Sequence, residues 1–193
     1  MPRVKMFNEQ EALEKAMLLF WEKGYTATSL TDLTQSMGIS KGSFYDTFHG
    51  KHELFEKVFE IYRASMLDKL KGILDSETDV KQGMRKLMTF TVEEAFNDEQ
   101  HKGCFAANVC SELGGRDESM GAILRGHNSN VRGIIANYLS NDPRLANPEQ
   151  LAGFFLTVLT GINQEVKVQR DKNKLLQTVE MSLHLLNDRT MLE

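Results

Sequence analysis

The stretch TSLTDLTQSMGISKGSFYDTF, residues 28–48, decides how the N-terminal part of this chain folds. Thr28 or Ser29 can cap a short helix, and Gly38 stands where a helix end favours a left-handed residue. Ser40 can cap a second short helix directly after it. Two short helices joined by a tight turn that contains glycine have the layout of a helix-turn-helix. The stretch therefore predicts a helix-turn-helix.

Helical periodicity continues on both sides of this stretch. Apolar residues recur at intervals of three and four, as on one face of a helix. No segment alternates β-branched and polar residues between turns, which would indicate a strand. Besides the two short helices, we expect helices at residues 9–23, 52–73, 80–96, 104–113, 118–139, 149–169 and 172–186. The sequence thus predicts an all-α fold of about nine helices.

The predicted helices divide into two units. Residues 1–50 hold the first three helices, and residues 51–193 form a larger helical body. Three short helices bury too little surface to be robust alone, so we expect the first unit to lean on the long helix at 52–73.

Charge limits the ways in which this chain can bind nucleic acid. It has 23 Lys and Arg against 27 Asp and Glu, a net charge of -4. Bulk positive charge therefore cannot hold DNA, and a DNA-binding role would need a local patch. Residues 1–51 are balanced too, with six basic and six acidic residues. Dimer symmetry would then have to supply much of any specific affinity.

Two cysteines are too few for a disulfide scaffold. Cys104 and Cys110 could form a bridge only if their segment were not regular helix, because six helical residues separate them by ~9 Å. The N-terminus lacks the apolar run of a secretory signal, and no apolar stretch reaches the ~20 residues of a membrane span. We therefore expect a soluble cytoplasmic protein with reduced thiols and no membrane partner.

Three motifs carry a resemblance to a known family. They are GYTATSL at residues 24–30, MGISKGSFY at residues 37–45, and Phe48 followed by KHEL at residues 51–54. In order and spacing they closely resemble the TetR family of bacterial transcriptional regulators, although Thr34 and Ser36 replace the small alanines of many members. The resemblance implies a ligand-responsive regulator, by default a repressor. Such a protein binds a near-palindromic operator in double-stranded DNA as a homodimer.

The residues of the N-terminal unit favour DNA contact on physical grounds as well. Free amides at helix N-termini attract phosphates, which suits Thr28, Ser29 and Lys51. On the second short helix, Lys41 and Ser43 can reach base edges, with Asp46 and Thr47 beside them, while Phe44 and Phe48 fit a core position. The predicted DNA-contacting residues are Thr28, Ser29, Ser40, Lys41, Gly42, Ser43, Tyr45, His49 and Lys51.

The resemblance implies that the body dimerises. The last two predicted helices carry apolar stripes broad enough for a four-helix interface between two copies. The predicted interface residues are Phe155, Leu159, Ile162, Val166, Leu176, Val179 and Leu183.

The resemblance also implies a pocket for a small-molecule effector in the body. Apolar residues with a few polar ones suit a small amphipathic or aromatic ligand, although the same pattern fits an ordinary core. The predicted pocket residues are Phe90, Phe96, Cys104, Phe105, Asn108, Glu112, His127 and Phe154, with Gln164 nearby.

Residues 103–113, GCFAANVCSEL, resemble a stretch from one branch of the family. Some relatives in that branch sense electrophiles or oxidants through cysteine. A sensing thiol needs exposure and a lowered pKa, whereas a free cysteine is often simply a small buried apolar residue. Cys104 and Cys110 fit either interpretation.

Enzyme and metal motifs are missing from the sequence. It has no P-loop, no G-x-S-x-G and no H-E-x-x-H, and His101 with Cys104 offers two ligands where zinc needs three or four. We therefore expect no enzyme activity, no cofactor and no metal. The alternative to a regulator is a helical dimer that has lost specific DNA binding and sequesters a partner. The intact SKGS at residues 40–43 argues against this alternative.

Overall fold

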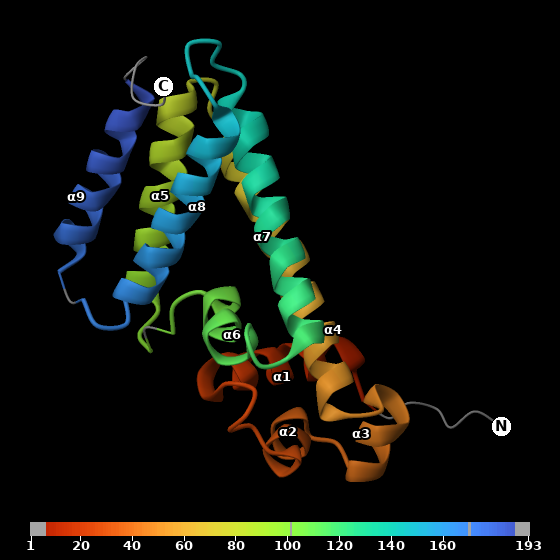
Figure 1. The fold of residues 1–193 in the computed structure, drawn as a ribbon. Coiled ribbons are helices and arrows are strands. Elements are labelled where there is room, and N and C mark those ends of the chain that lie inside the picture. The colour runs from red at the N-terminus through yellow and green to blue at the C-terminus, as the bar shows by residue number, and fades with distance from the viewer. Residues whose placement is uncertain (1–6, 101, 170, 188–193) are drawn as a thin grey trace.

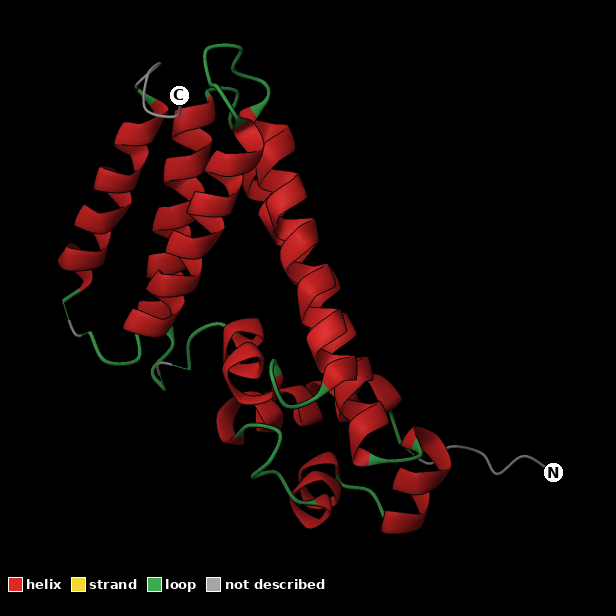
Figure 2. Cartoon of the chain, viewed as in Figure 1, coloured by secondary structure: helices red, strands yellow, loops and turns green. Residues whose placement is uncertain are grey.

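The computed structural model describes residues 7–100, 102–169 and 171–187. Within these ranges it contains nine α-helices, one short 3-10 helix and no strand (Figures 1 and 2). The helices are α1 Glu9–Lys23, α2 Leu30–Met37, α3 Lys41–Phe48, α4 Lys51–Asp75, α5 Val80–Asn97, α6 Phe105–Leu113, α7 Glu118–Leu139, α8 Pro148–Glu165, α9 Lys172–Ser182 and η1 Leu183–Leu186. The all-α prediction is confirmed.

Capping side chains explain where the helices begin. Asn8 accepts hydrogen bonds from the amides of Gln10 and Glu11 at 3.0 and 3.3 Å. Each such bond satisfies an amide that has no partner inside the helix. The same role falls to the residues that precede α2, α3, α5, α7 and α9: Ser29, Ser40, Asp79, Asp117 and Asp171.

The last two predicted helices each end four residues earlier in the structure. Helix α8 stops at Glu165 rather than at residue 169, because residues 166–168 form a turn. The segment predicted at 172–186 changes after Ser182 into the 3-10 helix η1. Short 3-10 segments are common at helix ends, and apolar periodicity alone does not reveal them.

Helices α1–α3 form a compact unit at one end of the molecule (Figure 1). Helices α4 and α7 run from this unit along the body, where α5, α8 and α9 lie, and α6 sits between the two parts. The chain has two apolar clusters, which we call the N-terminal core and the body core. The N-terminal core takes buried side chains from α1–α3, the first half of α4, α6 and the start of α7. The body core takes them from the end of α4, α5, the end of α7, α8 and α9.

The predicted boundary at residue 50 does not separate these two cores. Leu54, Phe55 and Phe59 of α4 pack in the N-terminal core, and so does Phe105 of α6. The first unit, α1–α3, therefore packs against α4, as we expected from its small size, and it also packs against α6. The division into residues 1–50 and 51–193 remains a prediction about function.

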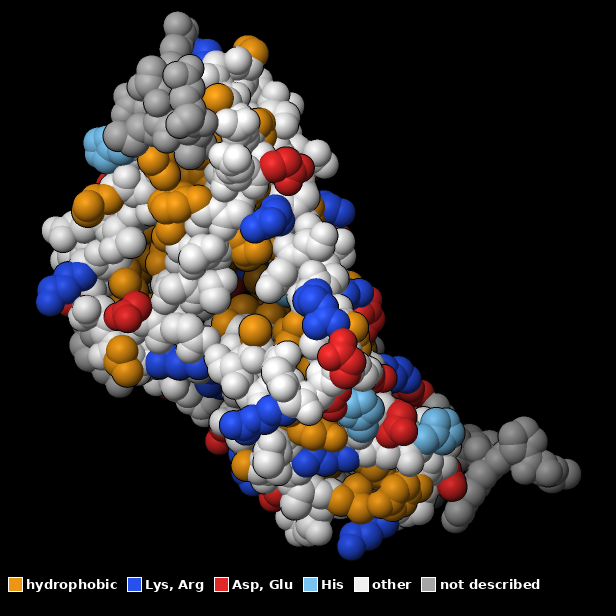
Figure 3. All heavy atoms as spheres, viewed as in Figure 1, with side chains coloured by type: hydrophobic (Ala, Val, Ile, Leu, Met, Phe, Trp, Pro, Cys, Tyr) orange, Lys and Arg blue, Asp and Glu red, His pale blue; other side chains and the backbone are white. Residues whose placement is uncertain are grey.

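Charged side chains of both signs are interspersed on the face that Figure 3 shows. This distribution fits the near balance of charge in the sequence. Among the described residues, no helix has both the length and the apolar character needed to cross a bilayer.

Candidate nucleic-acid interface

Two buried rings fix which side of helix α3 faces outward. Phe44 is fully buried and Phe48 is 3% exposed, and their ring centroids lie 5.8 Å apart. Residues four apart share one face of a helix, so both rings anchor the same side. The other side exposes Lys41, Gly42 and Tyr45, with 52% of Tyr45 accessible. The rings thus turn a polar edge of α3 toward solvent.

Ser40 caps the N-terminus of α3. Its Oγ accepts a hydrogen bond from Ser43 N–H at 3.1 Å and lies 3.0 Å from Ser43 Oγ. Such a cap typically contributes ~1 kcal/mol to helix stability. Ser40 therefore has a role inside the protein, whereas contact of Lys41 and Ser43 with bases remains a prediction.

His49 ends α3 in a left-handed conformation. Its φ is 66°, and its N–H donates to the Tyr45 carbonyl oxygen at 3.0 Å. Residues other than glycine adopt this region infrequently. The imidazole is exposed, so its contact with a phosphate stays a prediction beside its structural role as a helix cap.

A reciprocal capping box holds the N-terminus of α2. Asp32 N–H donates to Ser29 Oγ at 3.1 Å, and Ser29 N–H donates to the Asp32 carboxylate at 2.9 Å. The Lys23 ammonium lies 3.0 Å from the same carboxylate. Hydrogen bonds from Ser29, and then from Lys23, hold the pKa of Asp32 well below its usual value. The box leaves Ser29 exposed, and its phosphate contact stays a prediction.

Thr28 does not belong to the DNA-facing surface. Its side chain is 1% exposed, and its hydroxyl donates to the Gly24 carbonyl oxygen at 2.6 Å. Its N–H donates to the Tyr25 carbonyl oxygen at 3.3 Å. The prediction for Thr28 is wrong, because both of its donors are used inside the turn between α1 and α2.

Lys51 places a positive charge at the start of α4. The side chain is half-buried, and Nζ lies 4.3 Å from the centroid of the Tyr25 ring. Burial lowers the pKa of Lys51, and the nearby carboxylate of Glu112 opposes that shift. A cation held on an aromatic face loses part of its freedom before it meets a phosphate. Lys51 therefore remains a candidate for phosphate contact.

The predicted effector residues are spread over several surroundings. Phe105 is 1% exposed and packs in the N-terminal core, 5.3 Å from the Tyr62 ring. Cys104 Sγ lies 3.2 Å from the Tyr62 hydroxyl. Phe90 lies 4.6 Å below the Lys69 ammonium, and Phe154 is 39% exposed.

Glu112 is directed away from the body. Its carboxylate accepts hydrogen bonds from Tyr25 N–H at 2.9 Å and Thr26 N–H at 2.6 Å. The prediction that Glu112 lines an effector pocket is wrong, because both oxygens are engaged by the turn between α1 and α2.

Asn108 and His127 bring unpaired polar atoms into the interior. Asn108 Oδ1 and His127 Nδ1 are buried and find no hydrogen-bond partner among the residues that the structure describes. His127 is 7% exposed, and its ring lies 6.3 Å from that of Phe59. Burial, and then the charge of Arg63, lowers the pKa of His127. A buried polar atom without a partner typically costs ~1–3 kcal/mol, so both atoms would favour a ligand that pairs with them.

The two cysteines are free thiols in different surroundings. Cys104 is half-buried beside Tyr62, and Cys110 is exposed. Burial, and then the neighbouring Cys104, raises the pKa of Tyr62 well above its usual value, so its hydroxyl stays protonated and can donate. His101, considered above with Cys104 as a pair of metal ligands, lies outside the described residues.

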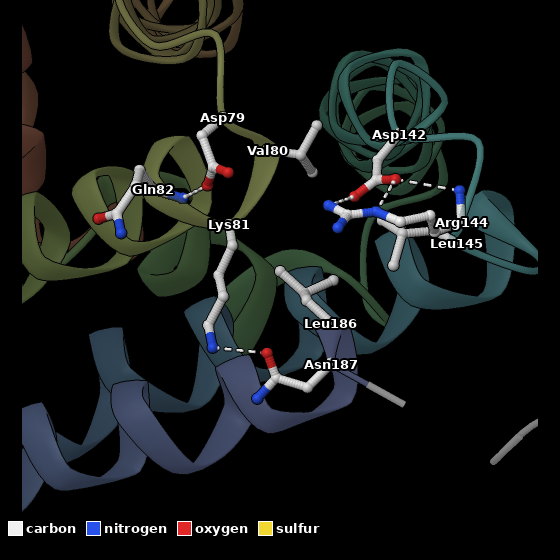
Figure 4. Close-up of a pocket in the computed structure, with 9 residues that line it drawn as sticks. All are labelled: Asp79, Val80, Lys81, Gln82, Asp142, Arg144, Leu145, Leu186 and Asn187. Carbon is white, nitrogen blue, oxygen red and sulfur yellow. Dashed lines mark hydrogen bonds and ion pairs between the residues drawn. The ribbon is translucent and has the colours of Figure 1, made fainter. Parts of the chain in front are cut away.

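A cavity of about 400 Å³, drawn in Figure 4, lies at the end of the body that is opposite α1–α3 in Figure 1. It is bounded by the start of α5, the loop between α7 and α8, and the end of η1. Its lining residues are Asp79, Val80, Lys81, Gln82, Asp142, Arg144, Leu145, Leu186 and Asn187. Arg144 pairs with Asp142 within the loop, where its hydrogen bonds lower the pKa of Asp142 to about 2, and Lys81 Nζ donates to Asn187 Oδ1 at 2.7 Å. The predicted effector residues lie elsewhere.

The side chains predicted at a dimer interface lie in the body core of the chain itself. Leu176 is half-buried against that core, and the others are at most 8% exposed. These others are Phe155, Leu159, Ile162, Val166, Val179 and Leu183. The prediction is wrong for these side chains, because the stripes of α8 and α9 are covered by α5 and α7 of the same chain. The exposed apolar residues there are Phe154, Val168 and Met181.

The sequence did not reveal the contacts that join the two parts. Trp21 Nε1–H donates to the Gly103 carbonyl oxygen at 2.9 Å, and Glu112 reaches the amides of Tyr25 and Thr26. These partners are more than 80 residues apart, so no periodicity or local motif indicates them. The one signal in the sequence for such a contact was Trp21, because the N–H of a buried tryptophan needs a hydrogen-bond acceptor.

Comparison with known proteins agrees with this geometry. The family model described as "Bacterial regulatory proteins, tetR family" matches residues 12–58, which include α2 and α3. The HTH-type transcriptional repressor ComR of Escherichia coli (strain K12) is 25% identical, over 95% of this chain and 90% of its own. The uncharacterized HTH-type transcriptional regulator YezE of Bacillus subtilis (strain 168) is 26% identical, over 97% and 100%.

A solved structure extends the similarity to the whole fold. It is a cysteine mutant of the TetR family transcriptional regulator CifR in complex with 26-base-pair operator DNA. The alignment has a TM-score of 0.83 and 28% identity, and it covers 94% of this chain and 98% of the CifR chain. With the matched helix-turn-helix and the polar edge of α3, these similarities show that the chain belongs to the tetR family of bacterial regulatory proteins, as a DNA-binding transcriptional regulator.

Proposed function

We propose that this protein is a ligand-responsive transcriptional repressor that binds a near-palindromic operator as a homodimer in the cytoplasm. The observation that carries the proposal is the construction of α3, in which Phe44 and Phe48 anchor a helix whose opposite edge exposes Lys41, Gly42 and Tyr45. The name of ComR describes a repressor, and the CifR structure contains operator DNA, which supports the same role here. We propose no enzymatic reaction for this chain.

The DNA contacts divide by type. Lys41 and Ser43 are proposed to meet base edges in the major groove, where Gly42 allows close approach. Base contacts supply sequence preference, and phosphate contacts set orientation. Ser29, Tyr45, His49 and Lys51 are proposed to contact phosphates. Thr28 is left out because its hydroxyl is buried.

A dimer would supply affinity that the nearly neutral N-terminal unit lacks. Two α3 helices about 34–36 Å apart can enter successive major grooves on one side of the duplex. The outward faces of α8 and α9, with Phe154 and Met181, are proposed to meet a second copy. Broad apolar stripes are not needed for this contact, since α5 and α7 already cover them.

Effector response is proposed to begin near Asn108 and His127. Their unpaired buried atoms favour a ligand with complementary hydrogen-bonding groups. A thiol-reactive effector is the other candidate trigger, because Cys110 is exposed and Cys104 lies at the base of α6. In either case the effector acts through its different affinities for two states of the dimer.

Electrophoretic mobility shift with the DNA upstream of the protein's own coding region tests the proposal. We expect a specific shift that weakens as salt rises, because phosphate contacts release counterions. A parallel thermal-shift screen of small aromatic and electrophilic compounds should find one that stabilises the protein and reverses the shift. A protein that shows no specific, salt-sensitive shift at low salt would instead fit a sequestering partner.

A further inference from the structure

The side chain of Glu112, near the end of α6, joins the body to the turn between α1 and α2. Both of its carboxylate oxygens accept backbone hydrogen bonds, from Tyr25 N–H at 2.9 Å and from Thr26 N–H at 2.6 Å. Hydrogen bonds to an ionised acceptor are about twice as strong as neutral ones. One carboxylate of the body therefore holds two successive amides of the DNA-binding unit.

Gly24 makes room for this carboxylate. Its φ is +80°, in the region that favours glycine, and a Cβ at this position would lie 2.8 Å from Glu112 Oε2. Real Cβ atoms do not come so close to another heavy atom, so a side chain at residue 24 would displace the carboxylate. Gly24 is thus needed for two reasons: it adopts the backbone conformation of the turn, and it leaves space for the Glu112 carboxylate.

Charge strengthens the contact. Burial raises the pKa of Glu112, but hydrogen bonds from Thr26 and Tyr25 and the charge of Lys51 outweigh burial and leave that pKa below its usual value. The carboxylate is therefore ionised at neutral pH. Lys51 in turn rests on the ring of Tyr25. Glu112, the turn at residues 24–26 and Lys51 form one cluster, which we call the Glu112 cluster.

The turn held by Glu112 leads directly into α2. Thr28 closes it through the hydrogen bond to the Gly24 carbonyl oxygen, and Ser29 then caps α2. At its other end, the segment that leads into α6 is joined to α1 by the hydrogen bond from Trp21 Nε1–H to the Gly103 carbonyl oxygen. The position of α6 is thereby linked to the start of α2 and to the Lys51 ammonium, which are both proposed to contact phosphates.

We propose that Glu112 is a positioning residue for DNA binding. Through the amides of Tyr25 and Thr26 it fixes the turn that orients the N-terminus of α2 and Lys51. This orientation therefore depends on the position of α6. Glu112 acts without touching DNA. The inference rests on the operator binding proposed above and adds a residue that the DNA-facing surface does not include.

Charge alone predicts the opposite effect. A carboxylate that lies near DNA repels phosphates within about 10 Å at 0.1 M salt. If Glu112 acted only through its charge, removing that charge would tighten DNA binding. If Glu112 positions the turn, removing the charge weakens operator binding in spite of the lower repulsion. The sign of the change therefore separates the two effects.

The experiment compares Glu112→Gln with Glu22→Gln in the full-length protein. Glu22 is an exposed carboxylate of α1, so its variant removes an equal charge from the DNA-binding unit itself and leaves α6 unchanged. Fluorescence anisotropy measures the Kd for labelled operator and for random DNA of equal length. We expect Glu112→Gln to raise the operator Kd about tenfold, while Glu22→Gln leaves that Kd unchanged or lowers it.

A second variant separates geometry from charge. Glu112→Asp keeps the carboxylate but shortens the side chain by one methylene, so it cannot reach both amides; we expect it to weaken operator binding as well. A loss of folded protein would reduce binding to operator and random DNA alike, whereas lost positioning reduces the ratio between them. The emission of Trp21, the one tryptophan, checks that the junction is folded.

Two results would overturn the inference: operator binding by Glu112→Gln as tight as wild type, or an operator-to-random ratio that is unchanged in both Glu112 variants. A failure of the proposed function looks different. In that case the wild-type protein itself shows no preference for operator over random DNA.

Discussion

In helix α3, a few buried side chains decide which residues face outward. Eight residues are too few for a stable isolated helix, so its shape depends on the cap from Ser40 and on the burial of Phe44 and Phe48. The fold depends less on Lys41 and Gly42, which are exposed, so their chemistry can serve recognition. Gly42 is the clearest case, because nothing in the protein itself requires a glycine there. The atom nearest to an added Cβ would be Ser40 Oγ at 3.8 Å.

Gly42→Ala should therefore separate stability from DNA binding. Alanine favours a helix over glycine by about 0.5–1 kcal/mol, so the free energy of unfolding should rise or stay unchanged. The added methyl group lies where the backbone is proposed to approach the major groove, so the operator Kd should rise by about tenfold or more. Urea denaturation and fluorescence anisotropy measure the two quantities. Unchanged operator affinity would remove Gly42 from the interface.

Lys51→Ala and Ser43→Ala should change DNA binding in two different ways. A lysine that contacts phosphate contributes about one unit to the slope of log K against log salt, so Lys51→Ala should flatten that slope and weaken binding to all sequences. Ser43→Ala should instead change the preference among operator bases. Binding measured at several salt concentrations on operator and random DNA distinguishes them. Equal losses on both DNAs for both variants would contradict the assigned roles.

At the scale of the helices, local chemistry correctly predicted where each helix forms, but it did not predict which segments pack against that helix. Asn8, Ser29 and Ser40 indicated where helices begin, because a cap acts within three residues. The apolar stripes of α8 and α9 correctly indicated buried faces. Periodicity does not say which chain buries a face, and Phe155 was therefore assigned to a second copy although its own chain covers it.

The exposed polar edge of α3 was predictable, and the links between the units were not. The edge of α3 depends on a contiguous motif, and its anchors Phe44 and Phe48 were correctly assigned to the core. Glu112 looked like a polar residue on an apolar helix, which is typical of a ligand pocket. Its true partners, the amides of Tyr25 and Thr26, belong to every residue type and leave no signature in a sequence.

Helices α5 and α7 meet where Gly83 faces Tyr138. A Cβ at residue 83 would overlap the Tyr138 hydroxyl, which donates to the carbonyl oxygens of Glu77 at 2.9 Å and Asp79 at 3.2 Å. Gly83→Ala should lower the free energy of unfolding by ~1–3 kcal/mol, as overpacking does. Tyr138→Phe should cost ~1 kcal/mol for the lost hydrogen bonds.

The double variant of Gly83 and Tyr138 supplies the control. Without the hydroxyl, the added methyl group meets less obstruction, so Gly83→Ala should cost less in the Tyr138→Phe background than in wild type. Urea denaturation of the four proteins gives the coupling. Strictly additive losses would show that the two residues do not crowd each other.

The chain as a whole combines two apolar cores with two long helices that pass through both. Helix α4 contributes Phe55 and Phe59 to the N-terminal core and Leu74 to the body core, and α7 contributes Met120 to the first and Ile135 to the second. The two long helices are therefore continuous elements that both cores share. His127 lies on α7 between these two cores, and its protonation should affect the stability of the entire fold.

The protein should become less stable as the pH is lowered, because of His127. Burial and Arg63 lower its pKa in the folded state, while Glu60 only partly opposes them. The unfolded chain then binds the proton first as pH falls through about 6.5, so acid favours unfolding. Tm should drop between about pH 7.5 and about pH 5.5, and the drop should be smaller in His127→Gln. An equal drop in both proteins would assign the effect to other groups.

Dimer formation should depend on the outward face of α8. Phe154 is 39% exposed, and its ring lies edge-on to that of Phe155, so we expect Phe154→Glu to cost a lone subunit little. In a dimer through α8 and α9, the same change buries a charge without a partner, which is strongly unfavourable. Light scattering should give twice 21.9 kDa for wild type and a lower average mass for Phe154→Glu, together with weaker operator binding.

Leu18→Glu is the matched control for the dimer. Leu18 is an apolar residue of α1 that is 55% exposed. Helix α1 belongs to the unit at one end of the molecule, whereas α8 and α9 lie in the body. Its variant introduces the same charge on an exposed apolar site, so the mass should remain that of wild type. A single-subunit mass for the wild-type protein at the concentrations that shift operator DNA would contradict the dimer. Without two copies, one α3 would have to bind a half-site alone, and the near-neutral charge of its unit offers too few phosphate contacts for that.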